Sequence, residues 1–386
     1  MFLLRHVPDT LATFMGLTSL AALAYLLLKW PLIQPHPFRR RLVLVCAAVA
    51  GVVMLGGLSL RSARIARHFS GDFSTFASAV ALTIVLTSVA ILILVGIVRL
   101  LPVRPHYSVG RRGFLLAARG AIIATPVVAT GYAVFIQRSD LALREVDIAI
   151  AGLPHELDGL RIVQLSDIHL SPFLSERELA RAVDMANECR AHLHLVTGDL
   201  ITSSSDPLDN CIGQLARLRS DAGALGCLGN HEIYAAAENY VEEQGMRRAG
   251  IHFLRNGSRT LTFKGKQINF AGVDYQRMGS HYLVGAEKLI RPGMTNILLS
   301  HNPDVFPVAA RQGFDLTISG HTHGGQINFE ILHRNLNIAS FYTPYVSGLY
   351  REGNSSVYVT RGIGTVGVPA RLGAPPEVAL IRLCAT

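Results

Sequence analysis

Long apolar stretches separated by short basic segments dominate the first third of the chain. Four of these stretches, at residues 11–28, 42–60, 76–101 and 114–136, are almost free of charged side chains. Each is close to the roughly 18–20 residues that a helix needs to cross the apolar core of a bilayer. Four such lengths in succession are untypical of buried helices in a soluble protein. The pattern therefore predicts a transmembrane region with four helices over residues 1–137, in an inner or plasma membrane.

From residue 138 onward, short apolar runs alternate with amphipathic segments. Residues 138–158 are polar enough to form a linker and an edge strand. Strand-like runs occur at 160–165, 194–197, 224–228, 296–300, 315–319, 356–360 and 378–383, a hairpin is expected around 264–266, and helical periodicity occurs at 176–190 and 207–219. This alternation predicts an α/β domain of stacked layers over residues 159–386.

The composition and the charge distribution agree with this division. Half of the 386 residues are apolar and 16% are charged, whereas about 25% are charged in typical soluble proteins. Residues 1–158 carry 15 Lys and Arg against 7 Asp and Glu, and residues 159–386 carry 21 against 20. The second part therefore lacks the basic surface that nucleic-acid binding requires, and no nucleic-acid partner is expected.

The basic residues between the apolar stretches predict an orientation. The first and third loops hold four Lys and Arg each, whereas the second loop holds three and the N-terminus one. Because such residues gather on the cytoplasmic side, the domain after residue 137 is expected to be extracytoplasmic. The segment 111–115, Arg-Arg-Gly-Phe-Leu, resembles a twin-arginine export signal and is equally consistent with ordinary flanking arginines. Both interpretations place the two arginines in the cytoplasm.

Polar side chains follow five of the predicted strands directly. The blocks are Asp167-Ile168-His169, Gly198-Asp199, Gly229-Asn230-His231, His301, and Gly320-His321-Thr322-His323. Ligands of open α/β sheets bind at the carboxyl ends of strands. Oxygen and imidazole donors without a thiolate favour Mn, Fe or Zn over a structural sulfur site, and one carboxylate is able to bridge two cations. Each block alone is a weak signal, and their joint occurrence predicts a metal centre.

These five blocks, in this order and spacing, resemble the calcineurin-like metallophosphoesterase family. Residues 323–327, 360–365 and 373–377 also look like its membrane-associated bacterial branch, and the resemblance covers about residues 160–383. It implies a two-sheet sandwich flanked by helices. It also implies a first metal held by Asp167, His169, Asp199 and His323, and a second held by Asp199, Asn230, His301 and His321. The resemblance further implies that His231 assists the leaving group without binding metal, and that Asn230 and Asp199 take part in catalysis.

The function expected from this resemblance is hydrolysis of phosphate mono- or diesters by metal-bound hydroxide, with two divalent metal ions (Mn, Fe or Zn) as cofactors. A membrane-anchored domain outside the cytoplasm would meet envelope or lipid-linked phosphates, so a substrate of that kind is expected. Two alternatives remain open at this point. One is a pyrophosphate hydrolase of a nucleotide-linked glycolipid of the UDP-diacylglucosamine type, and the other is a non-catalytic membrane sensor.

Overall fold

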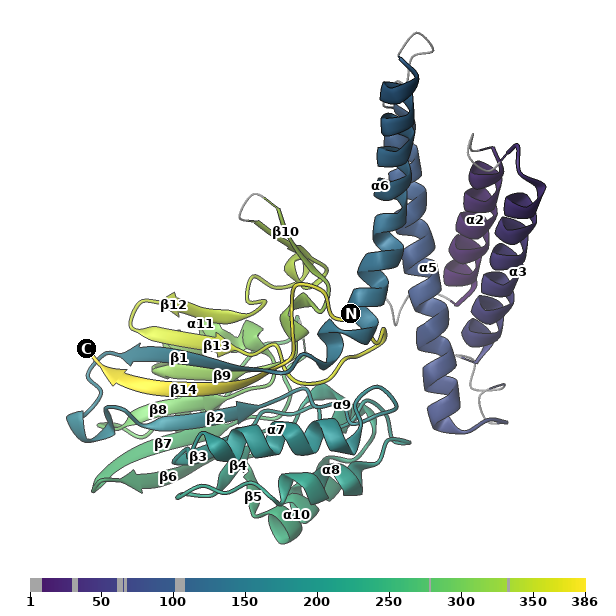
Figure 1. Ribbon diagram of the computed structural model, residues 1–386. Helices are drawn as coiled ribbons and strands as arrows, with labels where there is room; N and C mark the ends of the chain where they lie inside the picture. The colour runs from purple at the N-terminus through teal and green to yellow at the C-terminus, as the bar shows by residue number, and fades with distance from the viewer. Residues whose placement is uncertain are drawn as a thin grey trace. The chain divides into compact units, whose positions relative to one another are not determined.

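The computed structural model describes residues 9–29, 34–60, 65, 68–100, 108–277, 279–331 and 334–386. The chain divides into two compact units (Figure 1). A helical unit comprises Met1–Ile136 with Gly367–Ala370, and an α/β unit comprises Gln137–Val366 with Arg371–Thr386.

The helical unit contains four helices among its described residues: α2 (Asp9–Leu28), α3 (Pro37–Ser59), α5 (Gly71–Leu100) and α6 (Val109–Phe135). Three segments of the described chain are long and apolar enough to cross a membrane, namely Pro37–Ser59, Gly71–Leu100 and Val109–Ser139. Helix α2 has 20 residues, and its part with described side chains contributes the shorter apolar segment Thr13–Leu28. The predicted count of four spanning helices is therefore not confirmed.

Small side chains let these helices pack closely. A Cβ atom on Gly57 of α3 would lie 2.2 Å from the Ala77 carbonyl oxygen of α5, so only glycine fits there. The hydroxyl oxygens of Ser19 and Ser88 lie 2.8 Å apart between α2 and α5. Close backbone approach and hydroxyl bridges are typical of helices that pack within a bilayer.

Two six-stranded sheets form the core of the α/β unit. The first sheet has the order β1-β14-β2-β3-β4-β5, and the second has the order β12-β13-β9-β8-β7-β6. The strands of the first sheet are β1 (Ala142–Ile150), β2 (Arg161–Leu165), β3 (Leu193–Val196), β4 (Ala224–Gly226), β5 (Ile251–Phe253) and β14 (Glu377–Ala385). Those of the second are β6 (Gly257–Phe263), β7 (Lys266–Gly272), β8 (Thr295–Leu299), β9 (Leu316–Ser319), β12 (Gly348–Glu352) and β13 (Ser355–Val359). A separate two-stranded sheet pairs β10 (Asn328–Ile331) with β11 (Arg334–Asn337).

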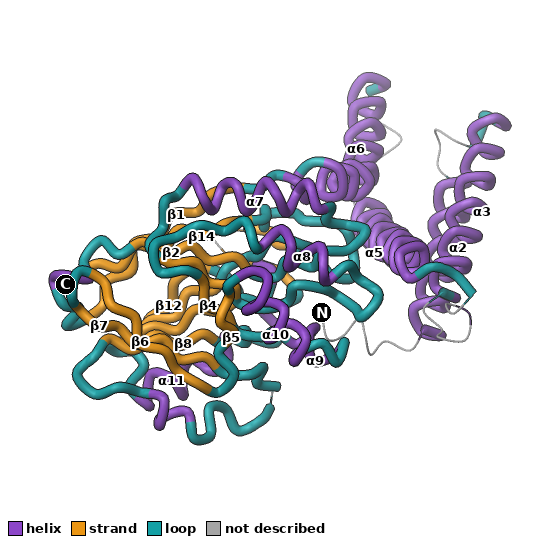
Figure 2. The backbone as a smooth tube through the Cα atoms, turned by 90° about the horizontal axis from the view of Figure 1, so that it is seen from below, coloured by secondary structure: helices purple, strands orange, loops and turns teal. Residues whose placement is uncertain are grey.

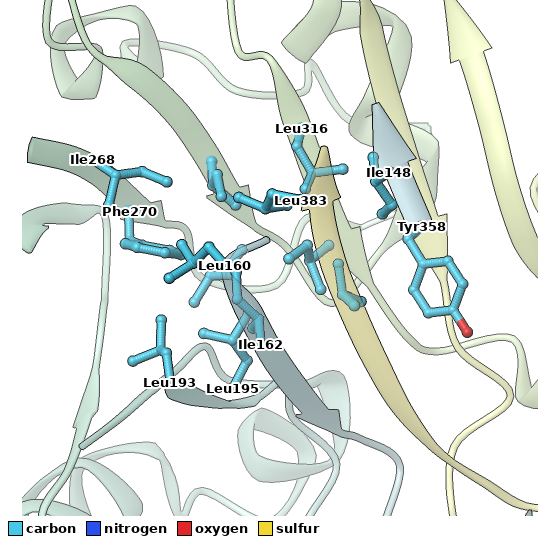
Figure 3. Close-up of a cluster of buried hydrophobic side chains, with 14 of the residues drawn as sticks. Ile148, Leu160, Ile162, Leu193, Leu195, Ile268, Phe270, Leu316, Tyr358 and Leu383 are labelled. Atoms are coloured by element: carbon cyan, nitrogen blue, oxygen red, sulfur yellow. The ribbon is translucent and has the colours of Figure 1, made fainter. Parts of the chain in front are cut away.

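Apolar side chains of both sheets meet in the middle of the unit. Ile162 and Leu195 of the first sheet pack in one cluster with Phe270 and Leu316 of the second (Figure 3). A second cluster joins the first sheet to helices α7 (Glu176–Glu188), α8 (Leu208–Leu215) and α10 (Glu238–Ala249), which cover its outer face (Figure 2). A third joins the second sheet to η3 (Ala286–Leu289) and α11 (Phe306–Gln312). The expected two-sheet sandwich flanked by helices is confirmed.

Short helical turns complete the described elements. These are α9 (Asn230–Tyr234), η1 (Gln137–Ser139), η2 (His155–Leu157), η4 (Pro303–Val305), η5 (His323–Gly325) and η6 (Ala339–Phe341). Local sequence explains where the longer helices begin and end. The Ser175 hydroxyl accepts from the Glu178 backbone N–H while the Glu178 carboxylate accepts from that of Ser175, a capping box at the start of α7.

Strand direction decides where the site forms. β2, β3 and β4 run parallel in the first sheet, and β7, β8 and β9 run parallel in the second. Their central members are buried on both faces, which explains why they read as continuous apolar runs. The segments that follow these six strands therefore emerge at one edge of the sandwich.

Candidate metal centre

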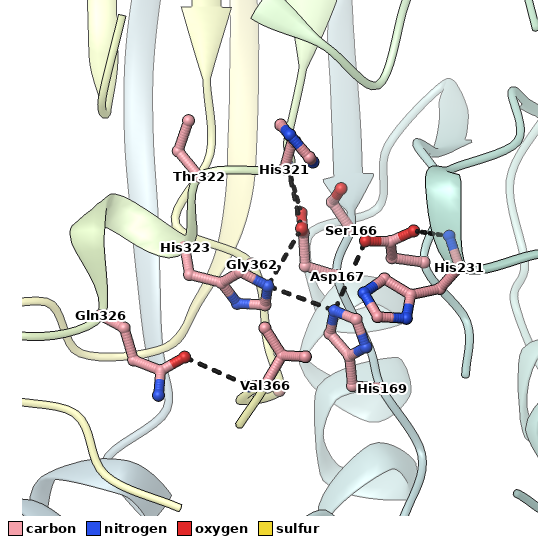
Figure 4. A network of polar contacts seen from close by, with 12 residues as sticks. Ser166, Asp167, His169, His231, His321, Thr322, His323, Gln326, Gly362 and Val366 are labelled. Atoms are coloured by element: carbon pink, nitrogen blue, oxygen red, sulfur yellow. Dashed lines mark hydrogen bonds and ion pairs between the residues drawn. The ribbon is translucent and has the colours of Figure 1, made fainter. Parts of the chain in front are cut away.

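The structure brings together all the side chains predicted as metal ligands. Asp167 and His169 follow β2, Asp199 follows β3, and Asn230 follows β4. His301 follows β8, and His321 and His323 follow β9. All of them are buried except His321, which is half-buried. Figure 4 shows Asp167 and His169, which come from the one segment after β2, close to His231 and His323 from other segments.

Two groups of donor atoms share this space. The donor atoms of Asp167, His169 and His323 lie within 4.8 Å of one another, as do those of Asp199, His301 and His321. Asp199 Oδ2 faces both groups, 3.5 Å from His169 Nε2 and 3.0 Å from His301 Nε2. Its carboxylate therefore stands where a bridging ligand is needed.

The spacing within the first group fits a shared cation. His169 Nε2 and His323 Nε2 are 3.2 Å apart, and His323 Nε2 is 3.4 Å from Asp167 Oδ1. Two donors about 2.1 Å from one metal are separated by roughly 3.0 Å at a right angle and 3.4 Å at the tetrahedral angle. In the second region, Asn230 Oδ1 is buried without a hydrogen-bond partner, as expected of an atom whose partner is a cation. The residues present fit a pair of divalent cations.

His231 also lies within this cluster. Its donor atoms are within 4.8 Å of those of His169 and Asp199, and its ring centroid is 4.8 Å from that of His169. Its Nδ1 lies 2.7 Å from the Thr202 carbonyl oxygen, and its backbone N–H donates to Asp199 Oδ1. Because a carbonyl oxygen only accepts, His231 Nδ1 carries a proton.

Backbone carbonyls orient a ligand imidazole in the same way. His301 Nδ1 lies 2.7 Å from the Thr197 carbonyl oxygen, so it donates there and leaves Nε2 directed at Asp199. His169 Nδ1 lies 3.1 Å from the Thr202 hydroxyl. Partners of this kind fix the ring orientation and tautomer of metal-binding histidines.

The charge state of the cluster is set by burial and by Asp199. Burial lowers the pKa of the His169 and His321 imidazoles to about 3, and that of His323 falls well below its usual range for the same reason. Burial opposes charge on His301, but the adjacent Asp199 raises the His301 pKa to about 10. Burial would raise the pKa of Asp199, yet His301 and His231 lower it well below its ordinary value. Neutral imidazoles and an ionised carboxylate are the forms that bind metal.

Five of the predicted ligands adopt a backbone conformation that side chains rarely take. Their φ angles are +49° at Asp167, +48° at His169, +56° at Asp199, +77° at His321 and +52° at His323. Left-handed backbone at non-glycine residues is strained and clusters at functional sites.

Glycines next to the ligands allow close approach. A Cβ on Gly229 would lie 2.1 Å from Asp199 Oδ1, and a Cβ on Gly320 would lie 2.3 Å from Asp167 Oδ2. Both distances are well inside van der Waals contact. The glycines of the sequence blocks are therefore required by the carboxylates beside them.

Three residues outside the predicted metal and catalytic set have a structural link to the site. The Tyr275 ring centroid is 5.4 Å from that of His321 and 6.1 Å from that of His301. Tyr275 follows β7, so it occupies a sixth strand end, a signal that the sequence contains. The Glu232 carboxylate accepts from the backbone N–H groups of Asp199, Leu200 and Gly229.

Arg371 is the third of these residues, and its side chain is fully buried. Its guanidinium donates to the carbonyl oxygens of Gly364, Ala374 and Arg361, at 2.5–3.1 Å. Arg371 Nη2 is also 3.5 Å from His323 Nδ1. No sequence pattern separates this arginine from those exposed in loops.

Comparison with known proteins gives a consistent result. The family model described as calcineurin-like phosphoesterase matches residues 160–325. The chain is 31% identical over 285 residues to the uncharacterized metallophosphoesterase YkuE of Bacillus subtilis (strain 168), which covers 72% of this chain and 99% of that protein. It is 33% identical over 280 residues to the transmembrane protein with metallophosphoesterase domain of Danio rerio, and this match covers 68% of this chain and 62% of that protein. The uncharacterized metallophosphoesterase Cj0846 of Campylobacter jejuni is 32% identical over 248 residues, and this match covers 62% of this chain and 63% of that protein. The chain thus spans less than two thirds of the last two proteins.

Proposed function

The chain belongs to the calcineurin-like phosphoesterase family of metal-dependent hydrolases, and we propose on this premise that it binds two divalent cations and hydrolyses phosphate mono- or diesters. The observation that carries the proposal is the position of Asp199 Oδ2, 3.5 Å from His169 Nε2 and 3.0 Å from His301 Nε2. A carboxylate within reach of an imidazole on either side is the arrangement that a two-metal site requires.

Each proposed cation has its own ligands. Asp167, His169, Asp199 and His323 would hold the first, and Asp199, Asn230, His301 and His321 the second. The donor set of oxygen and imidazole nitrogen suits Mn, Fe or Zn. The three parts of the chain in this proposal are a membrane region (1–137), a linker with an edge strand (138–158) and a phosphoesterase domain (159–386).

The residues of the site have separate tasks in the reaction. When bound, two cations supply Lewis acidity, which lowers the pKa of a water and neutralises phosphate charge. Asn230, whose Oδ1 is buried and unpaired, would hold the second cation through that oxygen. His231 keeps Nε2 toward the site because its Nδ1–H donates to Thr202 O, so a protonated His231 has a donor for the leaving oxygen.

The proposal places the α/β unit outside the cytoplasm, on an envelope or lipid-linked substrate. The Ser108 hydroxyl accepts from the Arg111 N–H at the start of α6, so Arg111 and Arg112 lie in its first turn. The 27 residues of α6 span about 40 Å, enough to separate its two ends by a bilayer. Arginines at one end therefore favour an extracytoplasmic position for the unit that follows the other end.

Metal content and activity together test the proposed function. We expect the purified full chain to hold about two metal equivalents and to hydrolyse p-nitrophenyl phosphate or bis-p-nitrophenyl phosphate. Asp199→Asn should hold one equivalent or none and lose turnover, whereas Asp221→Asn, at an exposed position, should behave as the wild type. Two bound metals without hydrolysis of either ester would refute the catalytic proposal. A periplasm-active reporter fused after Leu383 tests the orientation separately.

A further inference from the structure

A small apolar arm stands apart from both large sheets. It comprises the described residues 328–331 and 334–341, that is β10, β11 and η6, and Figure 1 shows β10 leaving the body of the α/β unit. Its exposed apolar side chains are Phe329 (51% exposed), Leu336 (50%), Ile338 (40%) and Phe341 (81%). Phe329 and Leu336 are direct cross-strand partners, so they lie on the same face of the hairpin. Clustered exposed apolar groups of this kind mark an interaction surface.

The base of the arm is fixed to the segment that carries His323. Asn337 is buried, its Nδ2 donates to Asn328 Oδ1 at 3.1 Å, and its Oδ1 accepts from the Ser340 N–H at 2.8 Å. Its side chain also packs on Gly325, where a Cβ would lie only 2.5 Å from Asn337 Cγ. Since Gly325 ends the turn that begins at His323, the arm borders the metal centre directly.

The base of the arm is also next to the point where the α/β unit continues from the apolar helix α6. The Asn328 N–H donates to the Leu372 carbonyl oxygen at 2.7 Å, and the Gly373 N–H donates to Gln137 Oε1 at 2.7 Å. Gln137 is two residues after the end of α6, and two residues span at most about 7 Å. The arm and the exit of the last apolar helix therefore share the segment 372–373.

The short connection from α6 through Gln137 to the base of the arm indicates which surface the arm is near. A spanning helix ends at the bilayer interface, so a membrane-spanning α6 would put Gln137 within several ångströms of lipid headgroups. The strands of the arm are four residues each, about 13 Å, which is long enough to cross that distance. Aromatic and aliphatic side chains are the groups that enter the interface.

We propose that the apolar arm inserts into the lipid surface of the membrane that holds the chain, and that the adjoining metal centre acts on phosphate esters of lipids in that same leaflet. The second half of this statement rests on the proposed function. Lipid contact by the arm is independent of the proposed function, because it is inferred from the exposed side chains and from the position of Gln137.

Fluorescence quenching tests lipid contact without any substrate. The single tryptophan is first removed by Trp30→Phe, and Phe341→Trp is then made in the full chain, which is reconstituted in phosphatidylcholine vesicles with or without brominated acyl chains. Brominated lipid should lower the emission of this variant at least twofold. The matched control is Lys266→Trp, exposed at the start of β7 and thus at the end of the second sheet opposite the metal centre, where emission should be unchanged. Equal emission from both variants in both lipids would overturn the arm's role.

A substrate comparison tests the second half. The variant Phe329→Ser/Leu336→Ser/Phe341→Ser should lose at least tenfold activity on phosphatidic acid in vesicles while p-nitrophenyl phosphate hydrolysis stays within twofold. Val284→Ser, at an apolar position 82% exposed outside the arm, should leave both rates unchanged. Equal loss on both substrates, or none on either, refutes selection of membrane lipids, and cross-linking of two chains through the arm would assign it to self-association instead. A wild type that hydrolyses neither compound refutes the proposed function, while the quenching result stands by itself.

Discussion

Glu232 supports the bridging carboxylate, and its removal should weaken the fold and the metal centre together. Its side chain is fully buried, and burial together with Asp199 raises its pKa to about 7. Oε2 accepts from the Asp199 and Gly229 N–H groups at 2.9 and 2.8 Å, and Oε1 accepts from the Leu200 N–H at 2.7 Å. Three buried donors on two strand ends thus depend on one side chain.

The magnitude follows from the number of donors left unpaired. Glu232→Gln keeps one side-chain oxygen. If this oxygen takes the Oε2 position, it still accepts from the Asp199 and Gly229 N–H groups, and the Leu200 N–H then faces the NH₂ of the amide. One unsatisfied buried donor costs about 1–3 kcal/mol. A loss of about 2 kcal/mol corresponds to a Tm lower by roughly 4–8 °C in a domain of 150–250 residues. Since Asp199 N is one of the donors, metal affinity should also fall by about 10–100-fold.

Thermal unfolding and metal titration of the full chain measure both effects. Glu188→Gln is the control, since Glu188 is exposed at the end of α7 and a surface change of this kind alters stability by less than about 0.5 kcal/mol. Excess metal should restore turnover in Glu232→Gln. The Tm of this variant measured without metal should still lie below that of the wild type measured without metal. If Tm and metal affinity both match the control, the supporting role of Glu232 is wrong.

Two further substitutions separate metal binding from chemistry. His231→Gln should keep the wild-type metal content and lose about 10²–10⁴-fold in kcat, since general acid catalysis contributes that much; exposed His155→Gln serves as its control, and an unchanged kcat would remove the assigned role. Gly320→Ala should displace Asp167, because the added Cβ would lie 2.3 Å from Asp167 Oδ2, and the metal content should fall to about one equivalent by elemental analysis. Gly213→Ala, which meets no atom closer than 3.9 Å, should keep both metals.

The sequence predicted most of the α/β unit because its central strands are buried on both faces. Strands such as β8 (Thr295–Leu299) therefore read as uninterrupted apolar runs with polar residues directly after them. The site was recognisable for the same reason, since the chemical groups sit at strand ends. The pairing of β10 with β11 was missed because the sequence between these strands contains neither Gly nor Pro and the strands have only four residues each.

Residues that act through the backbone were beyond the reach of the sequence. Arg371 stands in a loop of Gly, Val, Pro and Ala, a context that is ordinary for an exposed arginine. In the structure its guanidinium donates to several backbone carbonyls. Contacts with carbonyls carry no side-chain pattern, so only coordinates reveal them.

The two sheets contribute different halves of the metal centre, which links the site to the core between them. The first sheet delivers Asp167, His169 and Asp199, and the second delivers His301 and His323. Asp199 thus meets His301 across the junction, at 3.0 Å. Left-handed backbone costs about 1–2 kcal/mol per residue, so the strained ligands are held only because the packed core fixes both sheets. A cation bound across this junction would join the sheets a second time and stabilise the fold by mass action.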